Sequence, residues 1–141
     1  MSQTVSELTE ADRDFLESQR YWVAGHLADD AGVSFDDVGV KVQVVQAVLD
    51  NEWATEGETA KLQALGVVFG DVLSELLGAP WVIVDDEFGR DAALLVSDDP
   101  VILFPITMIS KRVEDGESVD VAELVSIAAE GAMRHLGGDE V

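Results

Sequence analysis

The first hydrophobic pattern along the chain has the spacing of an amphipathic helix. It follows Thr9, a residue suited to cap a helix, with Asp12 three positions later, and it extends to Gly32. The stripe consists of Phe15, Leu16, Gln19, Trp22, Val23, His26 and Leu27. The pattern predicts a first helix, and His26 on its apolar side is expected to be a hydrogen-bonded core residue rather than a catalyst.

The stretch from Ser34 to Trp53 supports two interpretations. Apolar residues at every third or fourth position from Val38 to Trp53 indicate a helix, while alternating valines from Val40 to Val44 are typical of a strand. The length of the stretch favours a helix, but β-branched residues lose side-chain freedom there. Residues 38–46 are therefore left open between helix and partial strand.

A long apolar face follows between Leu62 and Leu77. Thr55 and Glu58 precede it with the spacing of a capping box, and Gly78 and Pro80 end it. We expect a central buried helix here. Its two interior glycines, Gly66 and Gly70, each cost about 1 kcal/mol relative to alanine, which predicts close approach of another backbone.

Three short β-type segments come next, at about 81–85, 91–96 and 101–104. Turn residues at 85–89 and 97–100 separate them. Because a parallel pair needs a crossover of about a dozen residues, these segments must form an antiparallel meander. One face of the meander should lie on helices.

Two C-terminal helices complete the pattern. Pro105 suits the first turn of a helix that ends before Gly116, and Lys111 and Arg112 in its last turn complement the helix dipole. Asp120 then begins a final helix that ends at 137–138. The whole predicts a single α+β domain over 1–141, with a helical N-terminal half, a three-stranded meander, helices on one face of the sheet and a disordered tail at 1–9.

The charge of the chain narrows the choice of partners. Twenty-nine acidic residues stand against eight basic ones, a net charge of −21, while 48% of the residues are hydrophobic, enough for a folded core. Nucleic acids and anionic membranes would be repelled. A basic protein would be attracted, although the same charge can serve only solubility.

Catalytic motifs are missing from the sequence. It contains no cysteine, no H-E-x-x-H zinc motif, no phosphate-binding glycine loop and no G-x-S-x-G. We therefore expect no metal and no cofactor, and the sequence favours a non-enzymatic protein while leaving an enzyme open. The N-terminal residues lack a basic and apolar leader, and no apolar run approaches the ~20 residues that span a bilayer, so the expected location is the cytoplasm.

One polar cluster is a candidate binding patch. The D-E-F-G-R-D turn groups charges between two strands, and a helix returning along the sheet could bring the basic doublet to it. The candidate residues are Trp81, Asp85, Glu87, Arg90, Asp91, Lys111 and Arg112. As a structural alternative, these charges fix the hairpin end by exposed ion pairs worth about 0.2–1 kcal/mol each.

Several strings in this part of the chain resemble a known family. They are LQALGVVFGDVL, Trp81, the D-E-F-G-R-D turn and, most specifically, FPITMISKR at Phe104–Arg112. They are similar to the core of an uncharacterised bacterial family classed as domain of unknown function 3806, from about Leu62 to Leu124. The resemblance implies a small bacterial cytoplasmic α+β domain and supplies no catalytic residues.

The acidic charge and the missing catalytic motifs favour a non-enzymatic protein-binding module that engages a basic protein partner, while the resemblance leaves the function open. The alternative is a small-ligand sensor or an enzyme that uses the polar cluster at Asp85–Asp91 and Lys111–Arg112. The two differ in whether these residues line one enclosed pocket or lie along an open face.

Overall fold

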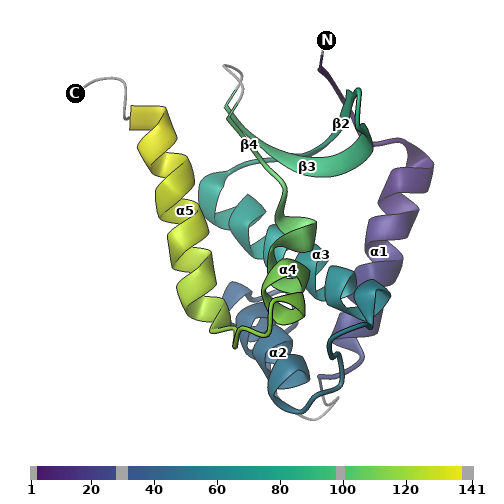
Figure 1. Cartoon of the computed structure of the whole chain (residues 1–141), viewed down its shortest axis with the longest axis vertical. Coiled ribbons are helices and arrows are strands. Elements are labelled where there is room, and N and C mark those ends of the chain that lie inside the picture. The colour runs from purple at the N-terminus through teal and green to yellow at the C-terminus, as the bar shows by residue number, and fades with distance from the viewer. Residues whose placement is uncertain (1–2, 28–31, 98–100, 138–141) are drawn as a thin grey trace.

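The computed structural model describes residues 3–27, 32–97 and 101–137. The fold is α+β, with one antiparallel sheet on one side and the helices gathered on the other (Figure 1). The elements in chain order are β1 (Thr4–Ser6), α1 (Glu10–Ala24), α2 (Val38–Asp50), α3 (Thr59–Leu77), β2 (Trp81–Asp86), β3 (Gly89–Ser97), β4 (Val101–Leu103), the 3-10 turn η1 (Pro105–Thr107), α4 (Met108–Glu114) and α5 (Val121–Gly137).

The sheet has four strands in the order β1-β2-β3-β4, so the expectation of three strands is wrong. The additional strand, β1, pairs with β2 in the register Val5 to Val84. It occupies 4–6, inside the stretch 1–9 that was expected to be a disordered tail. A three-residue edge strand with one apolar residue is too short to show the alternation of apolar and polar residues that indicates a strand. The predicted turn at 97–100 lies largely outside the described residues.

Helix α3 is the centre of the core, as its apolar face predicted. It contacts α1, α2, α4, α5 and η1. Leu62, Leu65, Phe69 and Leu73 are fully buried along it, and the left-handed Gly78 ends it at φ 64°. Every other helix is therefore positioned by its packing on α3.

Helix α2 resolves the open stretch in favour of a helix, and the partial-strand alternative for 38–46 is wrong. The Asp37 side chain accepts a hydrogen bond from the backbone N–H of Val40 and begins the helix. Val44, Val45 and Val48 are buried, and α2 lies against α3. Burial of this stripe outweighs the weak helix preference of valine.

The two expected capping boxes have different outcomes. Thr9 and Asp12 form a complete capping box at the start of α1. Thr55 does hydrogen-bond to Glu58, but α3 begins only at Thr59, so Thr55 is not its cap. Helix α1 also ends at Ala24, well before Gly32.

The sheet has apolar side chains on both faces. Trp81 packs with the helical core, while Val82, Val84 and Ala93 form a separate buried cluster, with Val5, Leu95 and Ile102 against it. Successive residues of a strand point to opposite faces, so this second cluster lies on the face away from the helices. The contact of Val5 with this cluster buries apolar surface and so helps to hold β1 in the sheet.

Lys111 and Arg112 lie in the last turn of α4, as expected. No helix within the described ranges is long and apolar enough to cross a membrane.

Candidate functional site

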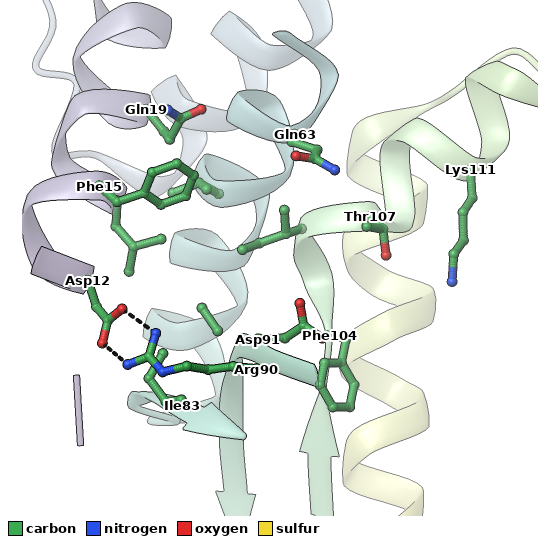
Figure 2. A pocket seen from close by; sticks show the side chains of 14 residues that line it. Asp12, Phe15, Gln19, Gln63, Ile83, Arg90, Asp91, Phe104, Thr107 and Lys111 are labelled. Carbon is green, nitrogen blue, oxygen red and sulfur yellow. Dashed lines mark hydrogen bonds and ion pairs between the residues drawn. The ribbon is translucent and has the colours of Figure 1, made fainter. Parts of the chain in front are cut away.

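A cleft of about 550 Å³ opens where α1, α3, the sheet and the η1–α4 segment meet (Figure 2). Its apolar residues come from all of these elements, and polar side chains stand between them. The lining consists of Asp12, Phe15, Leu16, Gln19, Gln63, Val67, Ile83, Arg90, Asp91, Ala92, Phe104, Ile106, Thr107 and Lys111.

An ion pair joins α1 to the β2–β3 hairpin at one end of the cleft. Arg90 donates to both carboxylate oxygens of Asp12, at 2.8 and 2.7 Å (Figure 2). The same carboxylate accepts hydrogen bonds from the backbone and hydroxyl of Thr9. Hydrogen bonds from Arg90 and Thr9 hold the pKa of Asp12 well below its usual range. Asp12 is thus an ionised carboxylate, held in position at this end of the cleft.

The opposite wall depends on the glycines of α3. A Cβ atom at Gly66 would overlap the carbonyl oxygen of Ile106, and one at Gly70 would lie 2.8 Å from Cγ of Pro105 and 2.5 Å from the Trp81 ring. The close backbone approach predicted from the two glycines is therefore present at Gly66, whereas Gly70 is approached by side chains. It places Ile106 and Thr107 in the lining, while Pro105 and Ile109 of the same FPITMISKR string are buried.

Four polar side chains of the lining make no hydrogen bond or ion pair within the part of the chain that the structure describes. They are Gln63, Asp91, Thr107 and Lys111. Figure 2 shows the Lys111 amine below α4, on the same side as the Thr107 hydroxyl. The formal charges of Asp12, Asp91, Arg90 and Lys111 sum to zero, so the cleft is neutral in a strongly acidic chain.

Of the seven candidate patch residues, the cleft brings together Arg90, Asp91 and Lys111. The expected meeting of the basic doublet with the hairpin carboxylates is not seen as an ion pair in the described ranges, where Arg90 pairs with Asp12 instead. Arg112 donates to the backbone oxygen of Met108, 3.1 Å away.

The remaining three candidates, like Arg112, lie outside the lining. Trp81 is half-buried, and its indole N–H donates to Asp71, 2.9 Å away. Asp85 is exposed on β2, opposite Arg90 in the register, and Glu87 is exposed in the tight turn between β2 and β3. Trp81 therefore contacts α3 at Gly70 and Asp71, outside the lining of the cleft.

Sequence reasoning missed the contribution of α1. Asp12, Phe15 and Gln19 lie more than seventy positions from Arg90 in the chain, so no local spacing connects them to the hairpin. Phe15 belongs to the apolar stripe that predicted the first helix, and only the structure shows that it remains 55% exposed at the cleft. The specific FPITMISKR string pointed to Phe104 and Thr107.

A second, smaller hollow of about 370 Å³ lies between the α2–α3 and α4–α5 connections. Four exposed carboxylates line it, from Asp50, Glu52, Glu56 and Glu117, and no basic residue does. Apolar atoms of Leu49, Val113 and Val119 are also in its lining. We call it the acidic hollow.

His26 is a packed aromatic residue. Its ring stacks on Trp53 at 5.3 Å and meets Trp22 edge-on, and Nδ1 lies 2.9 Å from the backbone oxygen of Trp22. Across residues 3–27, 32–97 and 101–137, no group of three metal-binding side chains occurs.

Comparison with known proteins identifies the fold and the family. A crystal structure from Bacteroides thetaiotaomicron VPI-5482 superimposes with a TM-score of 0.75 at 15% sequence identity, over 91% of this chain and 47% of that one. The likeness shows a shared fold, and this chain spans about half the length of that protein. No curated protein matches the sequence. The profile of the family described as Domain of unknown function (DUF3806) matches residues 41–124, and the chain therefore belongs to that family.

Proposed function

We propose that this chain is a non-enzymatic binding module whose acidic surface engages a basic protein partner. The observation that carries the proposal is that the negative charge is not neutralised within the chain. Ion pairs in the described part engage only the carboxylates of Asp12, Glu17, Glu58 and Asp71, against 29 acidic residues in the sequence. The remaining excess is available to attract and orient a partner of opposite charge.

The acidic hollow is the surface that best fits such a partner. A lysine or arginine side chain could lay its aliphatic stem on Val113 and Val119 and place its charge among the four carboxylates. Four like charges around one concave surface also concentrate the field toward the partner. A flat acidic surface would attract a basic protein without fixing its register.

Catalysis has less support. One of the two carboxylates at the cleft, Asp12, is held ionised because its pKa lies below the usual range, whereas a general acid at neutral pH needs a raised pKa. His26 is packed between two tryptophans, outside the cleft.

The test is affinity capture from a lysate of the native host at low and then moderate salt, with an equally acidic unrelated protein as background. The hollow variant carries Asp50→Asn, Glu52→Gln, Glu56→Gln and Glu117→Gln. A matched variant loses the same charge at exposed positions elsewhere, through Asp14→Asn, Glu75→Gln, Glu87→Gln and Glu130→Gln.

We expect one basic protein to be retained at the higher salt by the wild type and the matched variant and lost by the hollow variant. Titration of the purified partner should give the same order of affinities. Equal loss in both variants would reject the hollow as the docking surface. Capture no better than the acidic background would reject the function.

A further inference from the structure

We propose that the cleft is a binding site for a small organic carboxylate with a flat apolar body, whose anionic group is held by Lys111. The proposal is independent of the proposed function, because it uses a different surface with different chemistry. It rests on the shape of the cleft, its exposed aromatic side chains and the amine of Lys111, which forms no ion pair among the described residues.

The cleft has the size and walls of a small-molecule site. Its volume of about 550 Å³ falls within the ~300–1,000 Å³ typical of ligand pockets. Phe15 on α1 and Phe104 at the end of β4 are 55% and 42% exposed. Figure 2 shows them on different sides of the cleft, with Val67 and Ile106 also in its lining. Large exposed aromatic side chains at a concave site favour an apolar occupant.

Lys111 supplies the polar anchor. The other two lysines are engaged: Lys61 pairs with Glu58 at 2.7 Å, and Lys41 donates to the backbone oxygen of Asp36. Lys111 has no such partner among the residues that the structure describes, although acidic side chains are abundant in the sequence. Thr107 and Gln63 add uncommitted hydrogen-bond donors to the same lining.

The number of free cations selects the charge of the ligand. Arg90 is already committed to Asp12 through two hydrogen bonds, and Asp91 contributes a negative charge to the lining. Asp91 and Lys111 form no ion pair among the described residues, so the ammonium of Lys111 is the one cation of the lining that can pair with a ligand. A single carboxylate matches it, whereas a phosphate dianion would need a second cation.

The walls are also preorganised. The Asp12–Arg90 pair fixes α1 to the hairpin, and the close contact of η1 with Gly66 fixes the opposite side. A ligand would therefore bind without much ordering of the protein, which favours measurable affinity for a small molecule.

The experiment uses 2-naphthoate as the probe and 2-naphthamide as its uncharged counterpart. Binding of each to the intact chain is followed by ¹H–¹⁵N NMR titration. Lys111→Met removes the anchor. Arg112→Met removes the same charge from the neighbouring position, whose side chain is outside the lining, and serves as the matched control. Lys111 is exposed on α4 and Arg112 is half-buried there. The amide spectrum reports whether each variant remains folded.

We expect naphthoate to shift the amides of Phe15, Phe104 and Thr107 in a saturable manner. Lys111→Met should weaken it about tenfold, since a hydrogen bond to a charged group is lost, and bring it to the affinity of naphthamide. Arg112→Met should leave it unchanged. Equal effects of the two variants, equal binding of naphthoate and naphthamide by the wild type, or shifts that map away from the cleft would each overturn the proposal. So would the absence of saturable shifts.

Discussion

The cleft and the acidic hollow are both concave, but they are built from different physical ingredients. The cleft lies between regular elements, its formal charges cancel, and its shape depends on Gly66 and on the Asp12–Arg90 pair. The hollow lies between connecting segments and carries charges of one sign. Packing therefore determines the cleft, while charge determines the hollow. A change in packing should disturb the first, and a change in charge or salt should disturb the second.

The largest effect on the cleft alone is expected from Gly66→Ala. The added methyl group would collide with the backbone of Ile106, and overpacking of this kind costs about 1–3 kcal/mol. The gain in helix propensity, about 1 kcal/mol, offsets only part of it. We expect lower unfolding free energy in urea and weaker naphthoate binding, with capture of the basic partner unchanged.

Gly131→Ala in α5 is the matched control. The same methyl group there meets no atom within 4 Å, so only the helix propensity changes. The unfolding free energy should rise by up to about 1 kcal/mol. If both alanine variants were stabilised, the close approach of η1 would not be what shapes the cleft.

A smaller effect is expected where Trp81 contacts α3 at Gly70 and Asp71. Trp81→Phe removes the hydrogen bond to Asp71, which stays paired with Arg20 at 2.6 Å, and should cost about 1–2 kcal/mol. Gly70→Ala alone should also destabilise, because its methyl group meets the six-membered part of the indole.

The two changes should be coupled. Phenylalanine lacks the ring atoms that the alanine methyl group would meet, so the double variant should be more stable than the sum of the single effects predicts. Pro105 still limits the space, so the rescue should be partial. A double-mutant cycle by urea denaturation measures the coupling energy. Strict additivity would show that the indole does not restrict Gly70.

The sequence could predict what depends on local chemistry. Thr9 and Asp12 gave the start of α1, and Gly66 with Gly70 gave the close approach of another segment. It could not supply β1, whose three residues gain their place from pairing with β2, or the partner of Arg90, which lies 78 positions away. Both depend on contacts between distant segments. Of the residues that line the cleft, only Arg90, Asp91 and Lys111 were among the candidates named from the sequence.

The smallest expected effect is a change with pH in the stability that the Asp12–Arg90 ion pair contributes at the cleft. The pKa of Asp12 is lowered in the folded chain, whereas the ordinary value is 3.8. Its ion pair therefore stabilises the fold above about pH 4, and this contribution is lost as the pH falls toward the lowered value. Asp12→Asn keeps a side-chain oxygen that can accept the hydrogen bond from the Thr9 backbone N–H. It removes the negative charge that Arg90 binds.

The difference in urea midpoint between wild type and Asp12→Asn should consequently be largest near neutral pH and shrink below pH 4. Asp14→Asn, an exposed change on the same helix, should show no such trend. The net charge of the whole chain also affects its total stability, so the paired difference between the two proteins is the quantity to measure. A difference that stays constant with pH would mean that the Asp12–Arg90 pair closes the cleft without stabilising the fold.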